Sequence, residues 1–128
     1  MAAPATQLPV PVPVPVPVPL PARLPLLVLT HLPGHDAAME LARALVTERL
    51  AACVNIGAPV RSMYHWQGQI ETTDEIPVTI KTRAALYARV EAAIRARHPY
   101  ELPEIVAVPV IDGLRPYLDW LDAETVAA

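Results

Sequence analysis

The sequence contains a single cysteine, Cys53, among its 128 residues. One thiol cannot build an internal disulfide framework, so the chain fits a reducing compartment. The sequence also lacks a block of lysine and arginine, and its formal net charge is −3. We therefore expect neither nucleic acid nor an anionic membrane surface as a partner.

Membrane and secretion signals are missing as well. No apolar run is long enough to cross a bilayer as a helix. Residues 1–24 are apolar, but they lack the cationic start of a signal peptide, and proline at every second position breaks a helix there. We expect a cytoplasmic protein.

The motifs of the common catalytic sites are absent too. The sequence has no glycine-rich phosphate loop, no GxSxG, no HExxH and no CxxC. Its one cysteine and four histidines do not form a recognisable pair of nucleophile and base. We expect a protein that is not an enzyme.

Proline, by contrast, is abundant, because nine of the 16 prolines lie within residues 1–25. Residues 9–19 read PVPVPVPVPVP, which favours polyproline II over a strand, since proline removes every second ladder donor. We expect residues 1–24 to be a Pro/Val-rich tail, disordered or in polyproline II. This tail is either an extension without a role or a docking peptide for a partner. Residues 25–128 are expected to form the folded domain.

Hydrophobic periodicity predicts four strands and two long helices in that domain. The strands are expected over residues 26–32, 53–66, 69–81 and 104–111, with an irregularity at 57–59. The helices are expected over residues 37–51 and 83–97, capped by Asp36 and Thr82, and a short last helix begins near Gly113 and Pro116. The order βαββαβ predicts an α+β, ferredoxin-like antiparallel sheet with a C-terminal helix.

The two middle strands are longer than such a sheet requires, and one sheet face has only the short last helix to cover it. An apolar sheet face left uncovered is usually buried against another subunit. We expect the long hairpin to pair with a neighbouring copy in a closed homo-oligomer.

Five segments of this sequence resemble those of the CutA divalent-cation-tolerance family, in the same order and spacing. They are ERLAACVNI (48–56), SMYHWQGQIE (62–71), IKT (80–82), HPYELPEI (98–105) and YLDWL (117–121). The resemblance covers about residues 26–124 and implies a homotrimer with long hairpins swapped against neighbours. It also implies a small cytoplasmic protein tied to copper and other divalent metals. PII-like signalling trimers share this fold and bind small ligands in clefts between subunits.

The expected topology gathers candidate metal ligands at one end of the sheet. The end of the first strand, the end of the second helix and the start of the fourth strand meet there. They carry His31, His98, Glu101 and Glu104. Two imidazoles and a carboxylate suit Cu²⁺, which we expect first, or Zn²⁺, bound reversibly. The alternative is that His98 only ends its helix, where an imidazole is favourable. Some family members carry a metal-associated cysteine at the position of Thr30.

Three further residues are candidates for a ligand cleft between subunits. Lys81 precedes a helix start, where an anion site is plausible, and it could form a polar network with Glu75, Glu104 and Tyr100. Ordinary ion pairing is the alternative role for Lys81. A PII-like regulatory trimer that binds a small anion or nucleotide is therefore a second functional hypothesis. A trimeric scaffold with outward Pro/Val tails is a third.

Aromatic residues surround the expected turn at Gln67 and Gly68. Tyr64, Trp66 and Gly68 are expected at the trimer interface, because aromatic residues dominate interface cores. Stacking against a ligand is the alternative for the two aromatic side chains.

Overall fold

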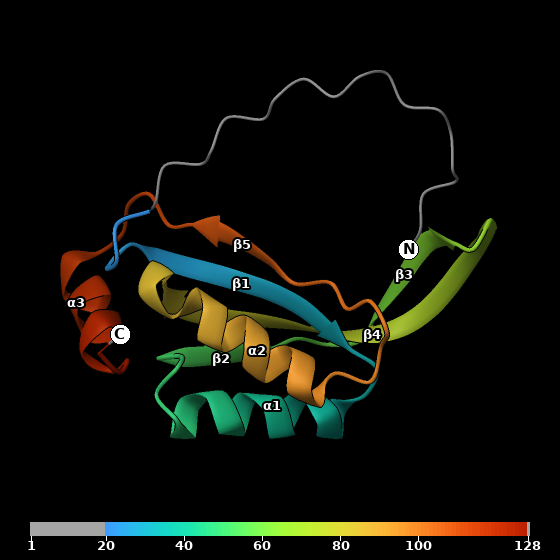
Figure 1. Ribbon diagram of the computed structural model, residues 1–128, viewed down its shortest axis with the longest axis horizontal. Helices are drawn as coiled ribbons and strands as arrows, with labels where there is room; N and C mark the ends of the chain where they lie inside the picture. The colour runs from blue at the N-terminus through green and yellow to red at the C-terminus, as the bar shows by residue number, and fades with distance from the viewer. Residues whose placement is uncertain (1–19, 128) are drawn as a thin grey trace, which may run out of the picture.

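The computed structural model describes residues 20–127, which form an α+β fold (Figure 1). Its elements are β1 (Pro25–Leu32), α1 (His35–Thr47), β2 (Cys53–Ile56), β3 (Val60–Trp66), β4 (Gln69–Arg83), a 3₁₀ turn (Ala84–Leu86), α2 (Tyr87–Arg97), β5 (Val106–Pro109) and α3 (Arg115–Ala123). The expected Pro/Val tail lies outside the described residues as far as residue 19. No helix among the described residues has the length and hydropathy of a membrane span.

The strands pair in the order β2-β4-β1-β5, and every pair is antiparallel. Helices α1 and α2 cover the same face of this sheet (Figure 1). This arrangement confirms the ferredoxin-like fold predicted from the sequence. The far half of β4 leaves the sheet, and its one strand partner in the described part of the chain is β3, which makes a projecting hairpin.

The core lies between the sheet and the two helices. Along β1 every second residue is fully buried, and the same alternation continues in β4 from Ile76 to Thr82. Val28 of β1 lies opposite Ile80 of β4, and both are completely buried. The other residues of these strands, including His31, Glu75 and Lys81, belong to the opposite, outer face of the sheet.

The expected second strand is interrupted between β2 and β3, at the position where the sequence indicated a bulge. Gly57 donates its N–H to the carbonyl oxygen of Pro77 at 2.9 Å. A Cβ atom at Gly57 would lie 2.8 Å from Cγ of Pro77, so only glycine allows this approach. Beyond the break, the hairpin turns at Gln67 and Gly68, whose φ angles of 51° and 78° are typical of a two-residue type I′ turn.

Several predicted boundaries were wrong. Helix α1 begins at His35 with Gly34 as its N-cap, so Asp36 lies in the first turn and does not cap it. Thr82 caps no helix, because β4 continues to Arg83, and its Oγ1 donates to the carbonyl oxygen of Leu50 at 2.7 Å. Strand β5 is shorter than the predicted strand 104–111, and α3 begins at Arg115.

Arginine side chains fasten the end of α3 to the sheet. The buried Arg83 donates from Nε to Oγ1 of Thr125 at 3.0 Å and from its guanidinium to the carbonyl oxygen of Val126. Arg49 forms an ion pair with Glu124 at 3.2 Å. Arg23 lies 3.8 Å from Asp122, so residues 20–24 are at the same end of the molecule as α3.

Candidate functional site

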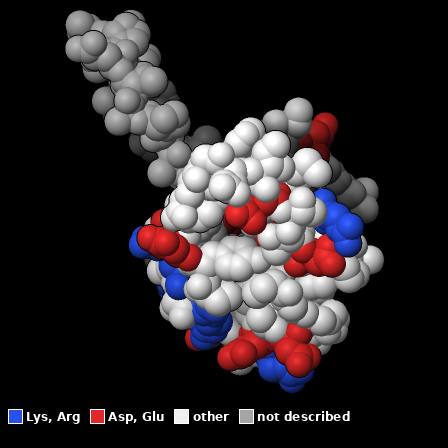
Figure 2. Space-filling view, turned by 90° about the vertical axis from the view of Figure 1, so that its right-hand side faces the viewer, with Lys and Arg blue, Asp and Glu red and all other residues white. Residues whose placement is uncertain are grey.

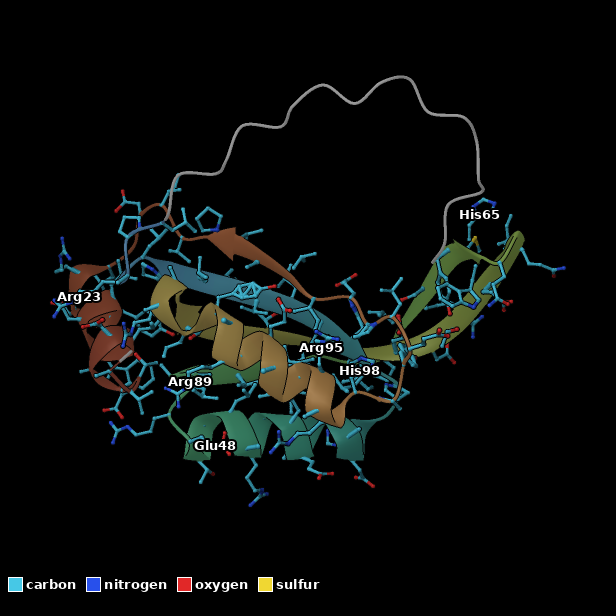
Figure 3. The ribbon with its side chains drawn as sticks, viewed as in Figure 1. Arg23, Glu48, His65, Arg89, Arg95 and His98 are labelled. Carbon is cyan, nitrogen blue, oxygen red and sulfur yellow. The ribbon has the colours of Figure 1, made fainter. Side chains whose placement is uncertain are left out.

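His98 lies where α2 ends, and its side chain joins the helix end to β1 (Figure 3). Pro99 follows it and favours the extended backbone that His98 adopts. Its Nε2–H donates to the carbonyl oxygen of His31 at 2.6 Å, and its Nδ1 accepts from the N–H of Tyr100 at 3.2 Å. Both ring nitrogens of this buried side chain are therefore engaged, which leaves no lone pair for a metal ion in this arrangement.

His31 makes a different contact on the outer face. Its Nδ1 lies 3.1 Å from Oε2 of Glu104, so an N–H at Nδ1 donates to the carboxylate. This hydrogen bond fixes the tautomer in which Nε2 carries the lone pair. Among residues 20–127, no hydrogen bond is found for Nε2 of His31. The imidazole is partly exposed, with 27% of its side-chain surface accessible, so a small ligand can reach it.

The four predicted metal ligands are thus only partly assembled. His31 and Glu104 meet side chain to side chain, His98 meets only the backbone of His31, and Glu101 is exposed without a described contact. No group of three or more His, Cys, Asp or Glu side chains within the described range is placed to hold a metal ion. Thr30 faces the helices, and its hydroxyl is buried without a described partner.

Glu75 and Tyr100 form a buried polar pair near this end of the sheet. Glu75 is only 8% exposed, and the hydroxyl of Tyr100 is buried with no described hydrogen-bond partner. Burial, together with the charge of Glu75, raises the pKa of Tyr100 to about 12. Figure 2 views the molecule from this end, and acidic side chains lie near the middle of the surface seen there.

Lys81 does not join this pair within one subunit. It is six residues farther along β4 than Glu75, a separation of about 20 Å in an extended strand. Its Nζ instead lies 5.8 Å from the ring centroid of Tyr117 in α3. Tyr117 also stacks on Trp120, with ring centroids 5.6 Å apart. This contact was not predicted from the sequence, although YLDWL was one of the segments that carried the resemblance.

The predicted interface residues lie on the projecting hairpin. Tyr64 and Trp66 are half-buried on one side of β3, and the hydroxyl of Tyr64 bonds to Oγ1 of Thr73 at 2.8 Å. Gly68 is at the exposed tip. On the opposite side of the strand, Met63 is 72% exposed, and His65 points away from the sheet (Figure 3).

The family of this chain follows from its similarity to known proteins. Residues 26–124 match the model of the family described as "CutA1 divalent ion tolerance protein". The chain belongs to the CutA1 family. The matched range contains all of the strands and helices except the first residue of β1, Pro25.

Individual relatives agree with this result. The divalent-cation tolerance protein CutA of Thermus thermophilus is 43% identical over 99 residues, which cover 77% of this chain and 96% of that protein. A solved CutA1 structure from Thermus thermophilus has a TM-score of 0.79, covering 80% of this chain and all of the other at 42% identity.

Other relatives differ in length and named location. The chloroplastic CutA protein of Arabidopsis thaliana is 37% identical over 100 residues, which are 78% of this chain but only 55% of that protein. A structure from Archaeoglobus fulgidus, with a TM-score of 0.77 and 36% identity, covers 79% of this chain and 98% of that one. It is described as the periplasmic divalent cation tolerance protein CutA. Relatives are thus named for different compartments, and a cytoplasmic location for this chain stays a prediction.

Proposed function

We propose that this chain is a homotrimeric, cytoplasmic protein of metal tolerance that binds a divalent cation weakly and reversibly. Copper is the first candidate and zinc the second. The role is binding and release rather than catalysis. In this proposal His31 supplies the nitrogen ligand through Nε2, and Glu104 holds the ring.

The contact between Nδ1 of His31 and Glu104 at 3.1 Å carries this proposal. A metal-bound histidine almost always donates its other ring N–H to a carboxylate, a carbonyl or water. The carboxylate selects the tautomer, orients the ring and makes the free nitrogen a better donor. His98 contributes indirectly, because its bond to the carbonyl of His31 holds the end of β1. A single imidazole per subunit supports weak binding, with water or a neighbouring copy completing the coordination.

The projecting hairpin supports the homotrimer. Residues 69–75 pair only with β3, and Ile70 and Met63 are 65% and 72% exposed there. An isolated two-stranded hairpin is marginally stable in water, so a neighbouring copy is its natural partner. Val106 and Val108 of β5 are also exposed, and within residues 20–127 α3 is the only helix beside the outer face.

Calorimetric titration of metal-stripped protein with Cu²⁺ and Zn²⁺ tests the metal site. We expect saturable binding of about one ion per subunit, a loss of at least tenfold in affinity in His31→Ala, and a smaller loss in Glu104→Gln, within the range typical of outer-shell partners. The matched control is His65→Ala, which removes an exposed imidazole from the hairpin tip. Equal binding in all variants, or a loss in His65→Ala alone, would contradict the assignment to His31.

A second candidate function is that of a PII-like regulatory trimer with a small anion or nucleotide in its intersubunit clefts. The observation that favours it is Lys81, whose ammonium has Tyr117 beside it and no ion pair with a described carboxylate. Titration with inorganic phosphate and with a nucleotide, compared with Lys81→Met, tests this role. Binding that is unchanged in Lys81→Met would exclude it.

A further inference from the structure

Glu75 of β4 is a mostly buried residue, and no cation accompanies its carboxylate among the described residues. Glu75 is 8% exposed, and among residues 20–127 its carboxylate forms no ion pair and has the hydroxyl of Tyr100 as its polar neighbour. The hydroxyl of Tyr100 is buried and reaches no partner at hydrogen-bond distance among these residues. Burying an ionised carboxylate is costly unless a cation or several donors accompany it. A group from outside the described subunit is therefore expected to complete this site.

Lys81 has the complementary property on the same face of the sheet. Glu75 and Lys81 both lie on the outer side of β4, since they are an even number of residues apart. The separation of about 20 Å is too long for the two charges to pair within one chain. Lys81 is also the only lysine of the sequence. Among the residues that the structure describes, the outer face thus has an anion without an ion pair at one end and a cation without an ion pair at the other.

The surface between these charges is apolar where β1 and β5 form it, and Thr79 of β4 and Asn55 of β2 add polar groups to it. Leu27 and Leu29 of β1 are half-buried there, and Val106 and Val108 of β5, which pair with Leu29 and Leu27, are 47% and 41% exposed. A face with an apolar centre and opposite charges at its two ends is complementary to another copy of itself. Charge complementarity of this kind fixes the register of a contact.

We propose that Lys81 of each subunit binds to Glu75 and Tyr100 of the next subunit, so that each of these sites is completed by a neighbouring copy. The inference rests on the homotrimer proposed above and names the residue that one copy contributes to the next. The contact is head-to-tail, and three such contacts close a ring. Glu75 is opposite Val60 at the base of the projecting hairpin, and Lys81 lies at the end of the molecule that carries α3. The proposed contact therefore places the hairpin of one subunit beside the α3 end of the next subunit.

In this contact the ammonium of Lys81 donates to the carboxylate of Glu75, and the hydroxyl of Tyr100 gains a polar neighbour. Tyr117 and Trp120 accompany Lys81 and place aromatic surface beside the pair. Aromatic anchors around a desolvated charge pair are typical of the residues that dominate interface energies. The binding surface is therefore polar at the contact between charges and apolar around it.

Charge reversal tests the pair. We expect Lys81→Glu and Glu75→Lys each to raise the subunit dissociation constant at least about tenfold, since truncating or reversing one partner leaves the other buried and unpaired. The double variant restores opposite charges and should recover the trimer mass in light scattering. The control is Arg95→Glu, the same change of charge on α2, on the other side of the sheet (Figure 3). Circular dichroism establishes that each variant is folded.

A chemical test uses the single lysine. A zero-length carbodiimide joins an amine to a carboxylate with loss of water, and peptide mass distinguishes the product of Lys81 from that of the N-terminal amine. We expect a Lys81–Glu75 amide that links two subunits. Coupling of Lys81 to another carboxylate, or no coupling, contradicts the contact.

The outcomes separate the two proposals. If the unchanged protein is not a trimer in light scattering, the homotrimer itself is wrong, and a dimer would mean that the outer faces meet around a two-fold axis. If the protein is a trimer but folded Lys81→Glu keeps its mass, or the double variant is no better than the single ones, only the Lys81–Glu75 contact is wrong.

Discussion

The imidazole of His98 donates from Nε2 to the backbone carbonyl of His31 at 2.6 Å, so the C-cap residue of α2 fixes the end of β1. The second ring nitrogen accepts the N–H of Tyr100, which turns the chain toward β5. Backbone groups at strand ends and after helices lack regular partners, and here one side chain satisfies two of them. His98 is thus a structural residue of the corner that carries His31.

Replacing His98 by alanine should lower the free energy of unfolding by about 2–3 kcal/mol, because two backbone groups lose their partner and a buried ring is removed. Urea denaturation measures this change. Calorimetry of the folded variant should still detect metal binding at His31. Full stability combined with complete loss of metal binding would instead identify His98 as a ligand.

Replacing Thr30 by valine should raise the free energy of unfolding by about 1 kcal/mol, since the buried hydroxyl has no described partner and valine has the same shape. Thr82→Val is the matched control on the adjacent strand. The hydroxyl of Thr82 donates to Leu50 at 2.7 Å, so its removal should lower stability by about 1 kcal/mol. Changes of the same sign in both variants would contradict this difference.

Tyr100 should make stability depend on alkaline pH. Burial first, and then the charge of Glu75, raises the pKa of Tyr100 to about 12, whereas the unfolded chain releases the proton near 10.0. An acid with a raised folded pKa contributes its stability fully below the unfolded pKa, and this contribution is lost as the pH rises from 10 through 12. After allowance for solvent screening, the loss is about 1–2 kcal/mol.

The measurement for Tyr100 is urea denaturation on both sides of this pH interval, with Tyr100→Phe as the reference. The unfolding free energy of the unchanged protein should fall relative to that of the phenylalanine variant as the pH rises. A constant difference would show that the tyrosine is not shielded as the structure indicates.

Gly57→Ala should destabilise the protein by about 1–3 kcal/mol, because the new methyl group would lie 2.8 Å from Cγ of Pro77. Thermal or urea unfolding measures the loss. The double variant Gly57→Ala/Pro77→Ala removes the clash, so the two effects should not add. Strict additivity would mean that the glycine acts through backbone conformation alone.

The sequence was sufficient to predict the topology and to predict which chain segments lie next to one another. Alternating residues such as Val28 and Ile80 indicated strands, and the order of elements then brought His31 and His98 to the same end of the sheet. The sequence was not sufficient to predict which atoms the ring nitrogens of His31 and His98 bind. That choice depends on the position of a carbonyl and of the Glu104 side chain, at distances that no periodicity encodes.

The boundary errors have a similar origin. Arg83 was expected to begin a helix, but its guanidinium bonds to Thr125 and Val126, far away in sequence, and β4 continues to reach them. Lys81, Glu75 and Tyr100 were expected together, and only the last two are neighbours within one subunit. Six residues of extended strand separate Lys81 from Glu75, a distance that depends on β4 being unbroken.

Strand β4 has three different partners along its 15 residues, since β1 and β2 flank one part and β3 pairs with the other. A slip of one residue would move every side chain to the opposite face of both the sheet and the hairpin at once. No local opening can release the central part of β4 while its flanking strands stay in place. Amide hydrogens between Val78 and Lys81 should therefore exchange with solvent only through global unfolding, and their exchange rates should be the slowest among the described residues.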